Sequence, residues 1–132
     1  MGKTKQLTVW VENTPGQMAR IARALAKARV NITAFTAYEM EGSSPIRLLV
    51  TNPVKAKRAL QALDLRVTED EVLRLTLPDR PGQLAAISER LAKLNINVEY
   101  AYATMSKGAK KGDLVLAVSD LTGAIRALKD AL

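Results

Sequence analysis

The stretch NTPGQMARIARALAKARVNI, from Asn13 to Ile32, returns further along the chain as DRPGQLAAISERLAKLNINV, from Asp79 to Val98. The two copies begin sixty-six residues apart in a chain of 132 residues. Ten of the first twenty-five aligned positions are identical, whereas unrelated segments would share about two. The repeat predicts two small units, because a unit of about 65 residues is only marginally stable by itself.

The first repeat shows the pattern of an α+β unit. Alternating apolar residues predict a strand over residues 7–11. Met18, Ile21, Ala22 and Leu25 then recur at helical spacing and predict a helix with these side chains on its apolar face. Strands near residues 30–39, 46–51 and 65–68, and a second helix after Asn52-Pro53, complete the order β-α-β-β-α-β of a ferredoxin-like unit.

The second repeat follows the same order but stops early. Its strands are expected near residues 71–77, 97–104 and 113–118, and its helices near 82–94 and 121–131. The prediction is two tandem ferredoxin-like units with antiparallel sheets, divided into domains 1–68 and 69–132 by a charged turn. Because the second unit lacks its last strand, its sheet edge must be covered by another chain, by the N-terminal segment, or by nothing.

The composition removes most kinds of chemistry. The chain has no Cys and no His, so it offers no thiol nucleophile, no imidazole base and none of the usual zinc ligands. Its carboxylates are scattered and form no clear acid–base pair. We therefore expect no catalytic residues, no metal and no cofactor. The N-terminus lacks a signal-peptide core and no apolar run could span a bilayer, so we expect a cytoplasmic protein.

The repeated turn brings backbone amides to a helix start. Pro-Gly opens each helix and leaves the first amides without intrahelical acceptors, so a small anion such as a carboxylate would suit them. An Asn stands fifteen residues after each Gly, and its amide can both donate and accept. A purely structural turn explains the same residues. The amides in question belong to Gly16, Gln17 and Met18, and to Gly82, Gln83 and Leu84.

These motifs give the chain a resemblance to a known family. The element order, ENTPGQM and PDRPGQL at the first strand-to-helix turn, and VNI and INV opening the second strand all resemble the ACT domain. The chain is similar to small proteins made only of two such domains. The resemblance implies a regulatory module in which an amino acid is held between the first turn of one ACT unit and the second strand of its neighbour.

The resemblance also implies which residues would contact the ligand. The turn contributes a polar residue, a glycine and the amides after it, and the strand contributes an asparagine and its successor. Asp79 stands where the first repeat has Asn13, so the two half-sites should differ in affinity or specificity. The implied ligand-binding residues are Asn13, Gly16, Gln17, Met18, Asn31 and Ile32, and Asp79, Gly82, Gln83, Leu84, Asn97 and Val98.

Charge leaves the identity of any macromolecular partner open. The net charge of +7 lies in the first half, where eleven Lys and Arg face four acids, against nine and nine in the second half. A solvated basic surface, an acidic protein partner and RNA all fit this pattern. RNA is the weaker alternative, because the third strands lack the basic-Gly-aromatic run of an RNA recognition motif.

Three interpretations of function follow. The first is an amino-acid-binding regulatory module, in a homodimer or higher oligomer, that signals to a partner protein. The second is an assembly module that uses the same interfaces without a ligand. An enzyme is the third and the most distant, because no pair of converging ionisable groups is evident. No membrane is expected as a partner, and an RNA-binding protein of the same fold remains the weaker alternative.

Overall fold

The computed structural model describes residues 2–104 and 110–129. The chain divides into two compact units. The first unit comprises Lys5–Asp70, and the second comprises the chain up to Thr4 together with the chain from Glu71 onward. A domain boundary between residues 68 and 69 stays a prediction.

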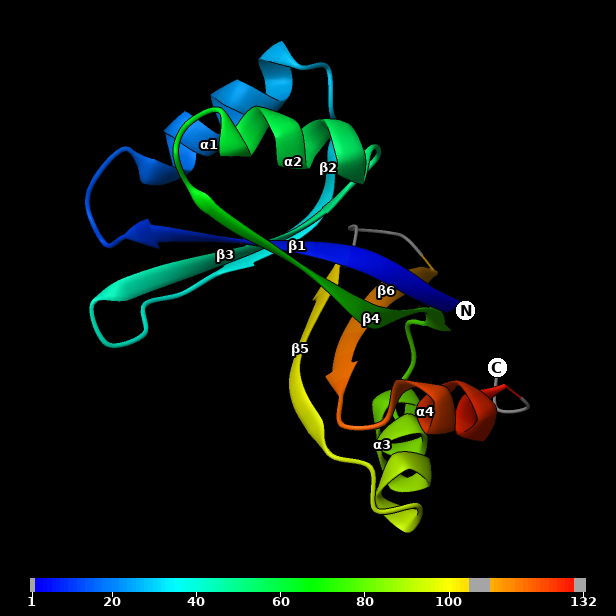
Figure 1. Ribbon diagram of the computed structural model, residues 1–132. Helices are drawn as coiled ribbons and strands as arrows, with labels where there is room; N and C mark the ends of the chain where they lie inside the picture. The colour runs from blue at the N-terminus through cyan, green and yellow to red at the C-terminus, as the bar shows by residue number, and fades with distance from the viewer. Residues whose placement is uncertain (1, 105–109, 130–132) are drawn as a thin grey trace. The chain divides into compact units, whose positions relative to one another are not determined.

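The first unit is a four-stranded sheet with two helices on one face (Figure 1). Its strand order is β2-β3-β1-β4, and β3 pairs antiparallel with both β1 and β2. This order confirms the ferredoxin-like prediction. The elements are β1 Gly2–Glu12, α1 Gln17–Lys27, β2 Ile32–Ala37, β3 Ser43–Val50, α2 Pro53–Gln61 and β4 Arg66–Pro78, of which β1 belongs to this unit from Lys5 and β4 as far as Asp70.

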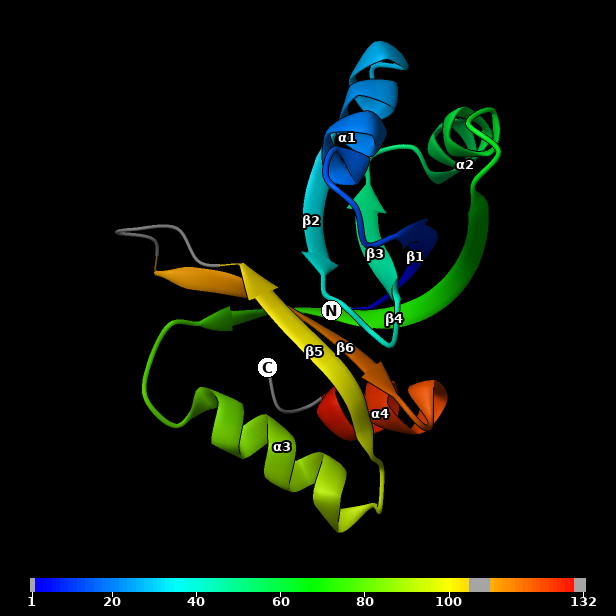
Figure 2. The same ribbon diagram turned by 90° about the vertical axis from the view of Figure 1, so that its left-hand side faces the viewer.

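The second unit repeats this arrangement from Glu71 onward (Figure 2). The chain forms α3 Gln83–Lys93, β5 Val98–Thr104, β6 Lys111–Val118 and α4 Leu121–Leu128. β6 pairs antiparallel with β4 and with β5, so that β5 lies at one edge of this sheet. The sequence leaves a loop over residues 106–112 between the strands predicted near 97–104 and 113–118. Residues 106–109 of this loop and the predicted end of the last helix at residue 131 lie outside the described residues, whereas Lys111 and Gly112 already belong to β6.

The N-terminal segment occupies the place of the missing fourth strand. The residues up to Thr4 belong to the second unit, where β1 is the neighbour of β4 in the strand order. The Nζ atom of Lys3 lies 3.4 Å from the Oε2 atom of Glu71. Of the three coverings that the sequence left open, this one is present in the structure.

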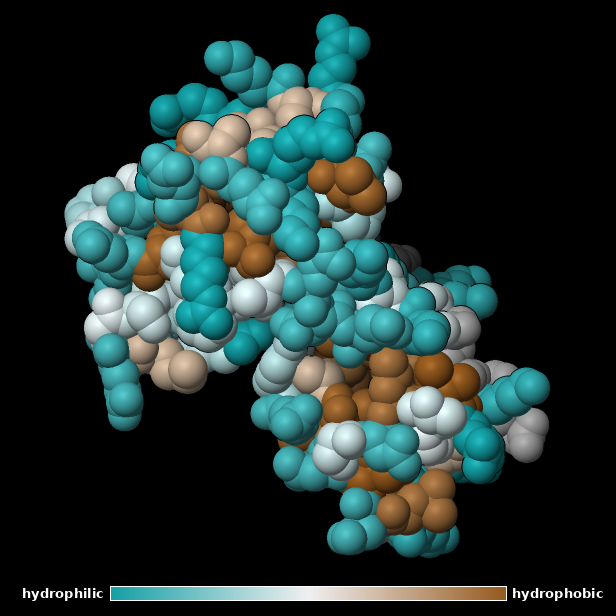
Figure 3. All heavy atoms as spheres, in the orientation of Figure 1, coloured by the Kyte–Doolittle hydropathy of each residue, from teal (hydrophilic) through white to brown (hydrophobic). Residues whose placement is uncertain are grey.

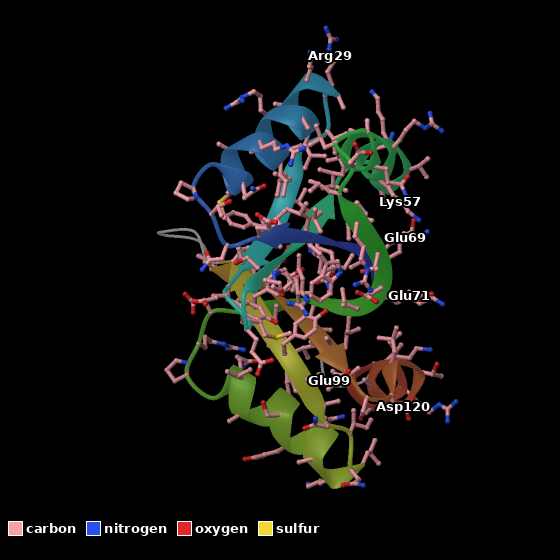
Figure 4. The ribbon with its side chains drawn as sticks, turned by 60° about the vertical axis from the view of Figure 1, so that its left-hand side comes forward. Arg29, Lys57, Glu69, Glu71, Glu99 and Asp120 are labelled. Atoms are coloured by element: carbon pink, nitrogen blue, oxygen red, sulfur yellow. The ribbon has the colours of Figure 1, made fainter. Side chains whose placement is uncertain are left out.

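The charged turn predicted after residue 68 is absent from the described structure. β4 is one continuous strand through Glu69 and Asp70, because side chains of other elements pair with its acidic residues. Glu69 lies 3.2 Å from the ammonium of Lys5 and 3.1 Å from that of Lys57 (Figure 4). The hydrogen bond from Lys57 is the largest cause that lowers the pKa of Glu69, and the bond from Lys5 is the second. The hydroxyl of Thr8 donates to Asp70.

Each unit has its own apolar core between helices and sheet. In the first unit Ile21 and Leu25 of α1 pack with Leu7, Leu48 and neighbouring residues. Met18 is 47% exposed, and Ala22 is exposed as well, so the buried face of α1 is narrower than predicted. Successive apolar residues at helical spacing span a wide arc, and only its centre faces the sheet. Among the described residues, no helix is long and apolar enough to cross a bilayer.

Candidate ligand site at the repeated turn

Both repeated turns place glycine in the left-handed region immediately before a helix. Gly16 has φ +91° and Gly82 has φ +90°. No heavy atom lies within 4 Å of the position that a Cβ would occupy at either residue. The backbone conformation, rather than lack of space, is therefore what favours glycine here. The helices α1 and α3 therefore begin from the same backbone conformation.

The helices that follow these turns differ from the other two helices in how they begin. α2 is capped by Asn52, whose Oδ1 atom accepts from the amide of Lys55 at 3.1 Å. α4 is capped by Asp120, whose Oδ1 atom accepts from the amide of Gly123 at 2.9 Å. Within the described chain, no side chain caps α1 or α3. Apart from the backbone amide of Gln83, which makes a long bond to the carbonyl of Arg80, their first-turn amides are the ones left for an external acceptor.

A pocket of about 240 Å³ lies at the turn of the first unit. Three of the predicted residues, Asn13, Gln17 and Met18, line it. The other walls come from the ends of β1 and β2 and the start of β3, which the unit's topology brings to the same end of the sheet. They are Val11, Glu12, Thr14, Ala37, Tyr38, Glu39, Ser44 and Ile46.

A second pocket of about 200 Å³ lies at the equivalent turn of the second unit. Asp79, Gln83 and Leu84 line it, and these are the repeat equivalents of the three predicted residues that line the first pocket. The remaining lining residues come from corresponding segments: Leu77, Pro78, Arg80, Ala103, Gly112, Asp113 and Leu114. The chain therefore forms a concavity at this turn twice.

Hydrogen bonds at the first turn leave an acceptor unpaired. The Nε2 atom of Gln17 donates to the hydroxyl of Thr14 at 3.0 Å. The Oε1 atom of Gln17 is buried and has no hydrogen-bond partner among the described residues. A buried acceptor without a partner costs about 1–3 kcal/mol. A donor group of a bound ligand, such as an ammonium, would remove this cost.

The second turn is organised differently. Arg80 stands where the first repeat has Thr14, so the hydroxyl that accepts from Gln17 has no equivalent at this position. The backbone N–H of Gln83 donates to the carbonyl of Arg80 at a long 3.4 Å. The backbone N–H of Asp79 donates to the carbonyl of Lys110 at 2.8 Å. The two pockets lie at the same turn, but their polar groups are not equivalent.

Electrostatics also separate the two pockets. Glu12 and Glu39 line the first pocket, and no Lys or Arg is among its described lining residues. In the second pocket, Asp113 accepts from Arg74 at 2.6 Å and from the hydroxyl of Thr76 at 2.9 Å. The bond from Arg74 is the main cause that lowers the pKa of Asp113. This carboxylate is already engaged within the protein.

The strand asparagines lie away from the pocket of their own unit. Asn31 precedes β2, next to the C-terminal end of α1, whereas the pocket lies at the N-terminal end of this helix. The amide of Asn31 donates to the Thr51 hydroxyl, and the Thr51 amide donates back to the Asn31 carbonyl, both at 3.0 Å. Asn97 exchanges the same two bonds with Ser119.

The residues that follow these asparagines, Ile32 and Val98, also line neither pocket. Ile32 packs partly against the core of the first unit, and Val98 is 36% exposed on β5. Within one unit, the structure therefore brings the turn residues together but does not bring the strand residues to them. Contact of the strand residues with a ligand would require a neighbouring ACT unit, as the resemblance implies.

The sequence did not point to the residues contributed by β2 and β3. Tyr38, Glu39 and Ser44 carry no motif, and their place in the pocket follows from strand pairing, which sets the end of β2 beside the start of β3. The sequence could have indicated these residues only through the ferredoxin-like order, which places the end of the second strand beside the start of the third. Among the described residues, no group of three acids forms a candidate metal site.

Comparison with known proteins agrees with this architecture. A crystal structure of protein BT0572 from Bacteroides thetaiotaomicron has a TM-score of 0.91 and 27% identity, covering 98% of this chain and 88% of that one. The ligand-free regulatory subunit of aspartate kinase from Thermus thermophilus has a TM-score of 0.66 and 16% identity, covering 100% and 98%.

A longer enzyme contains a similar part. The aspartate kinase of Clostridium acetobutylicum matches 98% of this chain with 33% of its own, at a TM-score of 0.61 and 13% identity. For the two aspartate kinase structures, the low identity means that the likeness shows the fold alone. No match was found among curated proteins. The model of the ACT domain pair, however, matches residues 2–127, and the chain therefore belongs to the ACT domain pair family.

Proposed function

We propose that this protein is a regulatory module that binds a free amino acid reversibly at its repeated turns and does no covalent chemistry. The observation that carries the proposal is the pocket formed twice, in each case at a helix start that no described side chain caps. The two helices away from these pockets are both capped. Membership of the ACT domain pair family supports the same function.

The ligand's carboxylate would lie at the helix start. The amides that follow Pro15 and Pro81 point out of the first turn, and the helix dipole favours an anion there by about 0.3–1 kcal/mol. The ammonium would lie on the acceptor side of the pocket. In the first unit the unpaired Oε1 atom of Gln17 and the side chain of Asn13 serve this role. In the second unit Asp79 takes the place of Asn13.

Asn31, Ile32, Asn97 and Val98 would complete the sites across an interface with a second copy. Their strands, β2 and β5, lie at the sheet edges of their units, and such edges can pair with another chain. Exposed apolar side chains lie on the same two strands: Phe35 of β2 is 53% exposed and Val98 of β5 is 36% exposed. Apolar surface of this kind is typical of a homodimer or higher oligomer.

Ligand binding would transmit a signal by favouring one arrangement of these interfaces. A ligand can shift an equilibrium only by its difference in affinity for the two states. A site completed by a neighbouring unit provides such a difference, because it exists only in the associated state. The signal would pass to a partner protein, and we place the module in the cytoplasm.

The alternatives are less well supported by the described residues. An assembly module without a ligand would fill the turn pockets with its own side chains, whereas both are hollow. An RNA-binding sheet would display aromatic side chains on its central strands. Here Phe35 and Tyr102 lie on edge strands, and Trp10 on β1 is half-buried with the guanidinium of Arg66 5.3 Å from its ring centroid.

A thermal-shift screen against the twenty amino acids at millimolar concentration tests the proposal. One or a few amino acids should raise the melting temperature, because a ligand that binds only the folded state stabilises it. The rise should shrink in Met18→Trp and Leu84→Trp, which fill the pockets. Val54→Trp is the matched control, since Val54 is 65% exposed on α2 and lines neither turn pocket. No shift with any amino acid would refute ligand binding.

A further inference from the structure

A basic groove lies between the two helices of the first unit, away from the turn pocket. Its volume is about 450 Å³. Its floor is apolar, with Ala24, Ala28, Ala59 and Leu63, and its rim carries Arg20, Arg23 and Lys27 of α1. Figure 3 shows tan apolar surface between teal hydrophilic side chains over these helices. No acidic residue is among the described lining residues.

The groove is held open by the way the helices are joined. The Nη2 atom of Arg20 donates to the carbonyl of Leu63 at 2.8 Å, just beyond the end of α2. This bond links α1 to α2 and satisfies a carbonyl that the helix end leaves unpaired. The alanines on the floor are too short to fill the space above them. A partner would therefore meet a preformed surface, which lowers the entropy cost of binding.

The second unit provides an internal comparison. There Arg90 also joins the two helices, since its Nη1 atom donates to the carbonyl of Ala127 at 3.1 Å. The repeat positions of Arg20 and Arg23, however, are Ala86 and Glu89. One arginine is thus enough to join the helices. Arg23 and Lys27 of the first unit are not needed for this purpose. Because Lys27 has a counterpart in Lys93, it is Arg23, at the repeat position of Glu89, that makes the groove of the first unit the more positive one.

The length and lining of the groove indicate what would bind in it. Residues 20–27 of α1 span two helical turns, roughly 10 Å along the axis, which exceeds the size of a single carboxylate or phosphate. The floor has aliphatic side chains and no aromatic ring on which a base could stack. An amphipathic helix with acidic residues beside an apolar stripe matches both the floor and the rim.

We propose that the groove between α1 and α2 of the first unit docks an acidic amphipathic helix of a partner protein. Apolar side chains of the partner contact Ala24, Ala28 and Leu63, and its carboxylates pair with Arg23 and Lys27. This docking proposal depends on the proposed function in one respect: the docked partner is the protein that receives the amino-acid signal. It names a surface distinct from both turn pockets.

The test uses a fluorescein-labelled helical peptide of Glu, Leu and Ala, with Leu on one stripe and Glu beside it. Fluorescence anisotropy should show saturable binding that weakens as salt rises. The variant Arg23→Glu/Lys27→Glu should weaken binding about tenfold or more. Lys55→Glu/Arg126→Glu changes the net charge equally but lies outside the groove, so its affinity should match the wild type. The same peptide with Gln in place of Glu should not bind.

Each opposite result would overturn the docking proposal. Absence of peptide binding, or equal weakening by the two double variants, would show that the groove does not select an acidic helix. Binding of labelled oligouridylate in place of the peptide, lost in Arg23→Glu/Lys27→Glu, would assign the groove to nucleic acid instead. The amino-acid thermal-shift screen on the same variants separates the two proposals, since Arg23 and Lys27 line neither turn pocket and are not among the proposed ligand-binding residues.

Discussion

Gly16 and Gly82 are the residues on which the repeated turn depends most directly. Their positive φ angles start α1 and α3 without a side-chain cap among the described residues. The sequence predicted these glycines and the amides after them. It placed Asn31 after the first helix, but nothing in a single sequence shows that its backbone exchanges hydrogen bonds with Thr51.

Replacing Gly16 with Ala should destabilise the first unit by about 1 kcal/mol. The cost comes from the backbone, because a Cβ in the left-handed region is strained even in open space. Gly82→Ala should cost the same in the second unit. Gly2→Ala is the matched control, since its surroundings are equally open and its φ is not in this region. Urea unfolding measures all three; equal stability of Gly16→Ala and wild type would contradict the account.

Asp113 should give the second unit a stability that depends on pH. The bond from Arg74 lowers its pKa below the ordinary value of 3.8. The contribution is therefore fully present above that value and is lost as the pH falls through the lower pKa of the folded state. Asp113→Asn should cost about 1 kcal/mol at pH 7, because the charge-assisted bonds are partly exposed.

The pH dependence of that variant provides the check. The difference in unfolding free energy between wild type and Asp113→Asn should shrink as the pH is lowered below 3.8. A difference that stays constant down to about pH 2 would show that the carboxylate charge is not the cause. Asp120→Asn is the carboxylate control: it lies outside the second pocket and should cost little at pH 7, because Asn caps a helix about as well as Asp does.

At the scale of elements, the type and order of helices and strands could be predicted from the sequence because their periodicity is strong. The continuity of β4 could not, because TEDE predicts a charged turn when its partners are unknown. Lys5 and Thr8 of β1 and Lys57 of α2 supply those partners. The place of the first residues in the second unit was likewise one of three open possibilities.

Deleting residues 1–4 should expose the edge of β4 in the second unit. An uncovered edge strand offers unpaired amides and carbonyls to other chains. We expect a lower melting temperature and concentration-dependent association, measured by thermal unfolding and light scattering. Lys3→Gln is the control: it removes only an ion pair whose side chains are 63% and 55% exposed, worth at most about 1 kcal/mol. An unchanged deletion variant would show that these residues do not complete the sheet.

At the scale of the whole molecule, the two repeats have the same fold and different chemistry. The first carries the basic groove and Asn13, and the second carries Asp79 beside Arg80. The sequence showed that Asp79 stands in the place of Asn13. It did not show that Glu39, which follows β2, lines the first pocket. The difference implies that two half-sites of one chain bind the same ligand unequally.

Asp79→Asn should make the ligand affinities of the two half-sites more alike. A carboxylate at this position attracts the ammonium of an amino acid and repels its carboxylate, whereas a neutral amide does neither, so the two half-sites should differ in affinity. Isothermal titration of the wild type should therefore show two affinities, which converge in Asp79→Asn. The reverse substitution, Asn13→Asp, should likewise make the two affinities converge. A single affinity in the wild type that neither substitution changes would contradict unequal half-sites.

The most direct measurement is an NMR titration of the ¹⁵N-labelled protein with each amino acid that raises its melting temperature. The account predicts that the largest amide shifts belong to Gln17 and Met18 in the first unit and to Gln83 and Leu84 in the second. Amides at the capped starts of α2 and α4 should move little. Saturable shifts confined to other segments, or no shifts at all, would contradict amino-acid binding at the repeated turns.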